Sequence, residues 1–179
     1  MEYITSLEAA TDRNQQYVLL ADTPFTEDNI ISIYDLYISR HDVPQTLQQV
    51  NLPFVELPPF YSMSRLADGA RVFYQDRTYG YIKCVNGDLE QVVYRYYIDE
   101  EGDAQRIDFY NRYGFIYRRD LIFKDDHTRL RSYYNSAGVE LIEVNESNGT
   151  VLLFEGCSVI ASFASEAEFY DYVRAQEEV

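Results

Sequence analysis

One recurring turn pattern constrains the fold of this chain more than any other feature. An Asn or Asp follows a mostly aromatic stretch and precedes a Gly, at Asp99–Gly102, Asn111–Gly114, Asn135–Gly138 and Asn145–Gly149, and a further turn is expected at 124–127. The Asn or Asp side chain can bond its own backbone, and Gly accepts a positive φ after the bend. One strand and one turn in roughly twelve residues is typical of consecutive hairpins. The pattern predicts an antiparallel β-meander over residues 69–161.

The predicted strands carry aromatic and charged residues on both faces. In segment 115–123, alternation places Phe115, Tyr117, Arg119, Leu121 and Phe123 on one face and Ile116, Arg118, Asp120 and Ile122 on the other. A sandwich would show apolar residues on the inner face and polar residues on the outer one. We therefore expect a broad single-layer sheet, partly covered by another element or a partner. Cross-strand Arg, Asp and Tyr pairs would stiffen it.

The segments that flank the meander have different patterns. Residues 1–50 indicate an α/β unit, in which Tyr17–Ala21 is a strand buried on both faces or a piece of helix. Thr26 is expected to cap a helix that contains Ile30–Tyr37. Residues 51–68 hold Pro53, Pro58 and Pro59 and predict an extended connector, apolar enough to lie against something.

A helix is predicted in residues 162–179, where Ser165 and Glu168 form a capping box. The expected fold class is therefore α+β and mainly β. It is an extended single-layer antiparallel meander, with an N-terminal α/β fragment and a C-terminal helix.

Charge and composition exclude several classes of partner. The chain has 15 Lys and Arg against 30 Asp and Glu, a net charge of −15 at pH 7. Nucleic acids and anionic membranes both require clustered cations, so neither is expected as a partner. No apolar run reaches the roughly 20 residues of a membrane span, and no secretory signal is found at the N-terminus. Two cysteines make no disulfide framework. We expect a reduced cytoplasmic protein.

The residue types that usually carry chemistry form no recognisable site. His41 and His127 lie in polar turns without a third metal ligand, and Cys84 and Cys157 are expected to be buried or half-buried inert thiols. The acidic stretch Asp99–Asp103 lacks the ligand order of a calcium loop and is expected to be a solvated hairpin tip. A glycosidase pair cannot be singled out among 30 acids. We therefore expect no enzyme activity, metal or cofactor.

Several strings of this sequence resemble one known family. They are Leu57–Tyr61, Ala70–Tyr74, Val92–Gly102, Arg106–Gly114, Tyr133–Glu140 and Glu143–Gly149. These strings are similar to the N-terminal part of the stabilising, non-catalytic subunit of the accessory Sec adhesin O-glycosyltransferase of Gram-positive bacteria. The stretch Phe25–Ser32 is similar to that family's early Phe-x-Pro-Asp-Asp turn, with Glu27 in place of Pro and Asn29 in place of the second Asp.

This resemblance implies a fold and a role. Members of the family carry two Rossmann-like halves, with an extended sheet inserted into the first, so residues 1–50 would be a fragment of that half. The implied partners are the catalytic glycosyltransferase subunit and a Ser/Thr-rich adhesin acceptor, and any membrane association would be peripheral and through the complex. Alternatives are a small carbohydrate-binding or carbohydrate-active domain, and the sheet of a catalytic or wall-teichoic-acid glycosyltransferase.

A partner or acceptor surface is expected on the sheet. Large apolar patches on soluble proteins usually mark partners, and Tyr and Arg are favoured interface anchors. The candidate residues are Tyr94, Tyr96, Tyr110, Tyr117, Tyr134, Arg118, Arg119 and Arg131. The rings are expected to include exposed ones, and the Arg side chains could bond the backbone of an extended acceptor. The alternative is that these Tyr residues only pack across strands.

Overall fold

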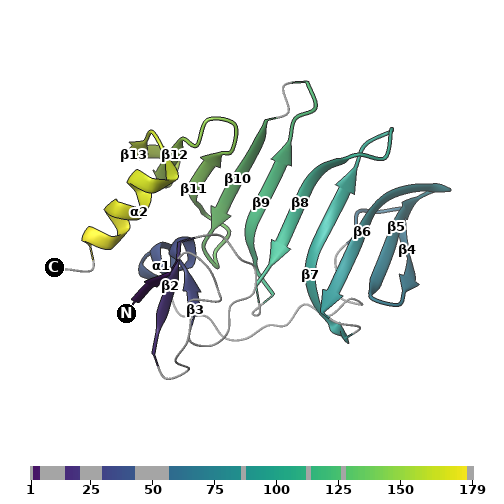
Figure 1. The fold of residues 1–179 in the computed structure, drawn as a ribbon. Coiled ribbons are helices and arrows are strands. Elements are labelled where there is room, and N and C mark those ends of the chain that lie inside the picture. Colours follow the sequence, from purple (N-terminus) through teal and green to yellow (C-terminus); the bar gives the residue numbers. More distant parts are fainter. Residues whose placement is uncertain are drawn as a thin grey trace.

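A ten-stranded antiparallel sheet dominates the computed structural model (Figure 1), which describes residues 2–4, 15–20, 30–42, 57–85, 88–111, 114–125 and 128–176. Each strand pairs with its neighbours in the chain, so spatial order follows sequence order. This arrangement confirms the predicted α+β, mainly β class. The strands are β4 (Tyr61–Leu66), β5 (Gly69–Tyr74), β6 (Arg77–Val85), β7 (Asp88–Ile98), β8 (Ala104–Tyr110), β9 (Ile116–Ile122), β10 (Arg129–Tyr134), β11 (Glu140–Asn145), β12 (Val151–Glu155) and β13 (Ser158–Phe163).

The sheet starts with β4, earlier than the expected start at residue 69. The prolines that favoured a connector end at Pro59, and Tyr61–Leu66 contains none. Every residue of β4 therefore pairs in register with β5.

The hairpin turns have the predicted chemistry. The backbone N–H of Gly102 bonds the carbonyl of Asp99, and Gly114 and Gly138 bond Asn111 and Asn135 in the same way. All three glycines have positive φ, between 75° and 92°. The side chain of Asn135 also accepts hydrogen bonds from the backbone of Ala137 and Val139. The repeated Asx-x-x-Gly unit thus sets where each strand ends.

The N-terminal unit is a small parallel sheet followed by a helix. Its strands are β1 (Glu2–Ile4), β2 (Tyr17–Leu19) and β3 (Ile30–Ser32), with β2 in the centre. Of the two alternatives for the apolar run at Tyr17, the buried strand is therefore right.

The helix of this unit, α1 (Ile33–Arg40), begins later than predicted. Ile30–Ser32 pairs with β2, and Ser32 caps α1 by accepting a hydrogen bond from the backbone N–H of Asp35 at 3.0 Å. Thr26, the expected cap, lies outside the described residues.

The second helix, α2 (Glu166–Ala175), begins at the predicted capping box. Ser165 Oγ accepts a hydrogen bond from the backbone N–H of Glu168 at 3.3 Å. Glu168 Oε2 accepts one from the backbone N–H of Ala164 at 2.9 Å. The cap fixes the direction in which the chain leaves β13.

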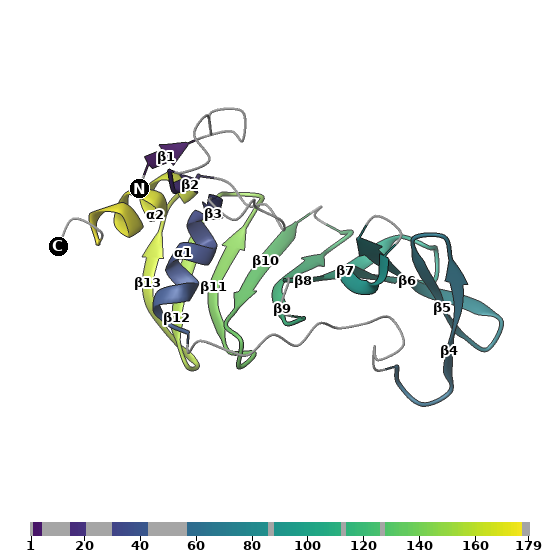
Figure 2. The ribbon, with the colours of Figure 1, turned by 90° about the horizontal axis from the view of Figure 1, so that it is seen from below.

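The two helices pack at the β10–β13 end of the sheet, while β4–β7 extend away from them (Figures 1 and 2). The main core lies between helices and sheet and includes Tyr34, Tyr133, Ile142, Leu153 and Phe169. A second cluster lies farther along the sheet, formed by Ala70, Val72, Ile82, Cys84, Val92 and Tyr110. Leu57, from the predicted connector, packs against this second cluster.

Candidate functional site

The strand register divides the candidate residues between two faces of the sheet. We call the face on which α1 and α2 pack the helix face; it carries the cross-strand row Tyr133, Arg118, Phe109 and Tyr94. The opposite face carries the row Ser132, Arg119, Asp108 and Arg95. Each face has an ion-pair network built around one fully buried Asp.

On the opposite face, Asp108 is the centre of the network. It accepts hydrogen bonds from Arg106 Nε at 2.9 Å, from Arg119 Nε at 2.7 Å and from Tyr97 Oη at 3.3 Å. The guanidinium groups of Arg95 and Arg106 both lie over the ring of Tyr97, each 4.5 Å from its centroid. Burial alone would raise the pKa of Asp108, but the two Arg partners outweigh it and lower the pKa below its ordinary value.

On the helix face, Asp120 has the same role. Arg118 donates two hydrogen bonds of 2.6 Å to the two carboxylate oxygens of Asp120, and Arg129 Nε donates one of 3.0 Å. Asp108 and Asp120 belong to adjacent strands and have no exposed surface. The predicted cross-strand Arg and Asp pairs are thus present on both faces.

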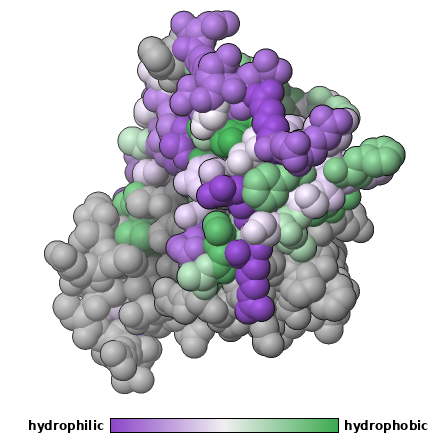
Figure 3. Space-filling model, turned by 90° about the vertical axis from the view of Figure 1, so that its right-hand side faces the viewer, coloured by the Kyte–Doolittle hydropathy of each residue, from purple (hydrophilic) through white to green (hydrophobic). Residues whose placement is uncertain are grey.

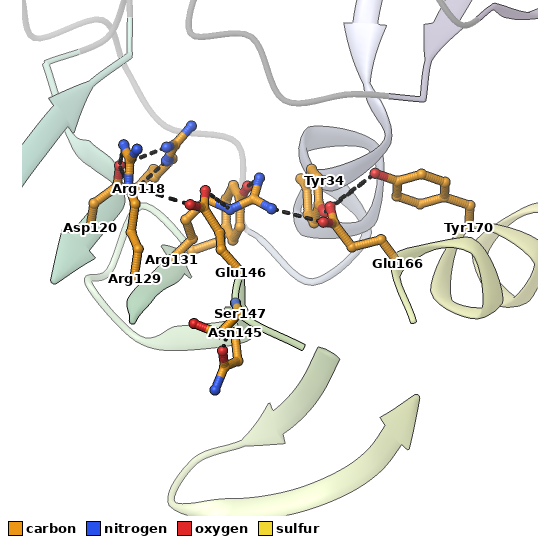
Figure 4. Close-up of polar contacts among 11 residues, drawn as sticks. Tyr34, Arg118, Asp120, Arg129, Arg131, Asn145, Glu146, Ser147, Glu166 and Tyr170 are labelled. Atoms are coloured by element: carbon orange, nitrogen blue, oxygen red, sulfur yellow. Dashed lines mark hydrogen bonds and ion pairs between the residues drawn. The ribbon is translucent and has the colours of Figure 1, made fainter. Parts of the chain in front are cut away.

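A polar cluster joins this network to both helices (Figure 4). Arg131 Nη2 donates to Glu166 Oε1 at 2.9 Å, and Arg131 Nε forms an ion pair of 3.0 Å with Glu146 without hydrogen-bond geometry. Glu166 Oε2 accepts hydrogen bonds from the hydroxyls of Tyr34 and Tyr170. Glu166 therefore connects α1, α2 and β10 through one carboxylate.

The five candidate tyrosines have different environments. Tyr94 and Tyr96 are half-buried on the helix face of β7, with ring centroids 5.0 Å apart in an edge-to-face contact. Tyr134 is half-buried under the guanidinium of Arg119, 5.5 Å from its ring. Tyr110 and Tyr117 are buried, so none of the five residues is fully exposed and the expectation that they include exposed rings is wrong. Burial raises the pKa of Tyr110 to about 12.

Tyr117 lies on the face opposite to the one that simple alternation gave it. A register shift lies where Phe109 pairs with Arg118 and Tyr110 pairs with Ile116, so Tyr117 is the extra residue of a bulge. Its ring contacts Phe109 on the helix face, with centroids 6.5 Å apart. The alternation of side chains fails at such a bulge.

The candidate arginines are bound within the chain. Arg118 and Arg131 are buried and hold Asp120 and Glu166, while Arg119 is half-buried and holds Asp108. These ion pairs give the Arg residues of the strands a structural role, which is to stabilise the sheet.

Sequence reasoning missed an aromatic cluster at the β4–β6 end. Tyr61 contacts Tyr74 and Tyr79, with centroids 5.0 and 4.8 Å away, and the rings of Tyr74, Tyr79 and Tyr81 are exposed. Phe60 is 89% exposed with a φ of 70°. The density of Tyr residues between 74 and 81 was the available signal. Hydrophobic and hydrophilic side chains are mixed over this side of the molecule (Figure 3).

The structure assigns the other conspicuous residues to turns and surfaces. His41 is exposed, with Nδ1 2.8 Å from the carbonyl oxygen of Tyr37, and His127 lies outside the described residues. Cys84 is a buried thiol as expected, but Cys157 is exposed because it lies in the turn between β12 and β13. In the described ranges, no group of three or more His, Cys, Asp or Glu is arranged to hold a metal ion.

The acidic hairpin tip surrounds a lysine. Lys124 Nζ forms ion pairs with Asp103 at 2.9 Å and Glu101 at 3.4 Å, and a shorter one with Asp99. The hydrogen bond from Lys124 lowers the pKa of Asp99 to about 2.

The described helices are all too short or too polar to cross a membrane.

Comparison with known proteins identifies a family. The family described as the GtfB middle domain matches residues 61–164, more than half of the chain and the same segment as the ten-stranded sheet. Among curated proteins, no sequence matches the chain.

The fold is similar to that of several solved structures, three of which follow. One is a GtfA/B complex bound to UDP and GlcNAc (19% identity, 92% of this chain and 37% of that chain, TM-score 0.78). Another is a Glycosylation Associate Protein (Gap123) complex from Streptococcus agalactiae (12% identity, 90% of this chain and 34% of that chain, TM-score 0.72). A third is the pneumococcal O-GlcNAc transferase GtfA with UDP and GlcNAc (14% identity, 92% of this chain and 35% of that chain, TM-score 0.67). The chain spans about a third of the length of each.

Proposed function

Since the chain belongs to the family of the GtfB middle domain, we propose that it is a non-catalytic module that stabilises a partner glycosyltransferase and helps to hold a Ser/Thr-rich adhesin acceptor for O-GlcNAc-type glycosylation. The observation that carries the proposal is that the family match coincides with the ten-stranded sheet. The solved complex of GtfA with GtfB supports a GtfA-type transferase as the partner. The proposed compartment is the cytoplasm.

The physical character of the sheet supports an interaction module. Two buried ion-pair networks hold β8–β10 from both faces, and Tyr97 of β7 bonds one of them, so a single layer stays ordered where no helix covers it. A rigid, uncovered sheet loses little conformational entropy when a partner binds. We assign partner contact to the half-buried helix-face rings of Tyr94 and Tyr96, with Tyr134 and Arg119 as candidates on the opposite face.

A second candidate comes from the likeness to GtfA itself, a transferase whose structure is similar in fold to 92% of this chain. On that alternative, the chain would be the sheet of a catalytic subunit. Its expected partner would then be a GtfB-type subunit in place of a GtfA-type one.

Co-expression separates the two candidates. The tagged chain is co-expressed with a GtfA-type transferase or, separately, with a GtfB-type subunit, and captured complexes are weighed by light scattering. Retention of the GtfA-type transferase, with a higher melting temperature for that transferase, supports the proposal. Retention of only the GtfB-type subunit would instead identify a catalytic-subunit sheet. Release of UDP from UDP-GlcNAc by the purified chain alone, with acceptor peptide present, would contradict the non-catalytic role.

Acceptor holding needs its own assay. The chain, alone and in complex with the transferase, is titrated with unglycosylated Ser/Thr-rich acceptor. Tyr94→Ala and Tyr96→Ala are expected to weaken binding about tenfold, equivalent to about 1.4 kcal/mol, without a change in melting temperature. Unchanged affinity in a folded double variant would remove these rings from the acceptor surface.

A further inference from the structure

Strand β4 presents an open edge of the sheet. In the described part of the chain β4 has a partner only on the β5 side, and its six residues pair with β5 without a register shift. The strand contains neither Pro nor Lys, which are common protections of an edge, and Arg65 is its single charged residue. The outer row of backbone N–H and C=O groups can therefore pair with an added strand.

The other end strand, β13, is less suited to accept a strand. Its ladder with β12 contains a register shift between Leu153 and Phe154. The ring of Phe163 on β13 also packs against Phe169 and Tyr172 of α2, with centroids 5.8 and 5.1 Å away. An added strand there would meet the side chains of α2, whereas neither of the two described helices lies beside β4 (Figure 2).

Next to β4, the guanidinium group of Arg71 is accessible to an anion. It lies 5.9 Å from the ring of Phe73 and 5.6 Å from the ring of Tyr81, and the residue is exposed. Within the described ranges, no carboxylate pairs with it, whereas four arginines farther along the sheet bind Asp108 or Asp120: Arg106, Arg118, Arg119 and Arg129. A guanidinium oriented by aromatic rings loses little freedom when it binds a carboxylate in bidentate fashion.

The register places a small residue between Arg71 and the open edge. Ser64 is the cross-strand partner of Arg71, so both side chains are on the helix face. Strands are about 4.8 Å apart, so a residue on an added strand would be about 10 Å from Arg71 in the backbone. A Glu and an Arg side chain can close that distance above a Ser, which does not obstruct them.

We infer that β4 receives an extended segment of a partner protein as an eleventh strand, and that one carboxylate of this segment pairs with Arg71 above Ser64. The segment is rich in β-branched residues, which favour the extended backbone of a strand, and carries few other acids, because a chain of net charge −15 repels an acid-rich partner. This surface goes beyond the proposed function and does not depend on it.

The test uses the full chain, isotopically labelled, and the peptide acetyl-Thr-Val-Thr-Glu-Thr-Val-Thr-amide. Chemical-shift titration is expected to move the backbone amide signals of β4 first. Arg71→Gln is expected to raise the dissociation constant about tenfold. Arg65→Gln is the matched control, because Arg65 is exposed on β4 with Ala70 as its partner, on the face opposite to Arg71. Its affinity should not change.

Two peptide controls keep the test valid even if a protein variant is unstable. Replacement of the peptide Glu by Gln should cost the same tenfold on the unaltered chain, and backbone N-methylation of alternate residues should abolish binding. Arg71→Glu should restore binding of a peptide that carries Lys in place of Glu. The inference is overturned by shifts centred on β13 or absent at millimolar peptide, by equal losses in Arg65→Gln and Arg71→Gln, or by full binding of the N-methylated peptide.

Discussion

The ring of Tyr34 lies flat on the ring of Tyr133, with the centroids 4.3 Å apart and the planes 4° from parallel. Tyr34 belongs to α1 and Tyr133 to β10, and neither ring is exposed to solvent. Phe169 of α2 also stacks on Tyr34, at 5.5 Å. One aromatic residue thus joins the N-terminal unit, the sheet and the C-terminal helix.

Removal of this ring should separate the three elements. Tyr34→Ala is expected to lower the free energy of unfolding by about 3–5 kcal/mol, because it opens a cavity in the core. Tyr34→Phe keeps the stack and loses only the hydrogen bonds of the hydroxyl to Glu166 and Tyr170, so about 1–3 kcal/mol is expected. Urea denaturation measures both. Equal losses would mean that the hydroxyl bond, and not the stack, carries the stability.

Tyr117 should respond differently to the loss of its hydroxyl. Its Oη is buried and has no hydrogen-bond partner among the described residues. Tyr117→Phe removes an unsatisfied polar group, so stability should stay the same or rise by up to about 1 kcal/mol. Tyr117→Ala should lower it by about 3 kcal/mol through the cavity. A loss above 1 kcal/mol in Tyr117→Phe would show that the hydroxyl has a partner.

The raised pKa of Asp35 leads us to expect that stability depends on pH. Burial raises its pKa to about 6, against a smaller lowering by the hydrogen bond from Ser32. The pKa in the folded state lies above the unfolded value of about 3.9, so the free energy of unfolding falls as the pH rises from about 4 to 6. Above about pH 6 the full loss of stability from the buried carboxylate is reached. Asp35→Asn should therefore stabilise the chain by about 2–3 kcal/mol at pH 7.5 and little at pH 4. A difference that is the same at both pH values would contradict this assignment.

The lowered pKa of Asp108 leads us to expect the reverse dependence of stability on pH. Its pKa is lowered in the folded state, so its contribution is present above the unfolded value of about 3.9 and is lost as the pH falls through the folded pKa. Asp108→Asn should lower the free energy of unfolding by about 2–4 kcal/mol at pH 7, because Arg106 and Arg119 lose their partner. Asp103→Asn, at the exposed hairpin tip, is the control and should cost less than about 1 kcal/mol. A similar loss in both variants would argue against a special role of the buried network.

Gly80 should tolerate no side chain. A Cβ at this position would lie 2.1 Å from the backbone oxygen of Tyr96 on β7, so Gly80→Ala would force the two strands apart. We expect a loss above about 3 kcal/mol or failure to fold, measured by circular dichroism and soluble yield. Gly138→Ala meets no atoms within 4 Å and is strained only by its φ of 75°, so about 1–2 kcal/mol is expected. A well-folded Gly80→Ala chain would show that β6 and β7 can separate without cost.

The positions of the turns could be predicted because their cause is local. Asn111 and Gly114, or Asn135 and Gly138, set the bend through bonds that span three residues. The capping box at Ser165 is local in the same way. The pairs Arg106 with Asp108 and Arg118 with Asp120 are also visible in the sequence, because residues two apart in a strand share a face.

Which face each residue occupies was decided only by the tertiary structure. The bulge at Tyr117 reverses its face, and a bulge depends on how β8 and β9 pair rather than on the residues of one strand. The bond from Tyr34 to Glu166 joins residues 132 positions apart, and no periodic pattern contains that information. The hairpin turns and the cap of α2 thus follow from the amino-acid sequence, because their interactions span only a few residues. The burial of Tyr110 and Tyr117, the partners of Arg131 and the open edge at β4 follow from packing between distant segments.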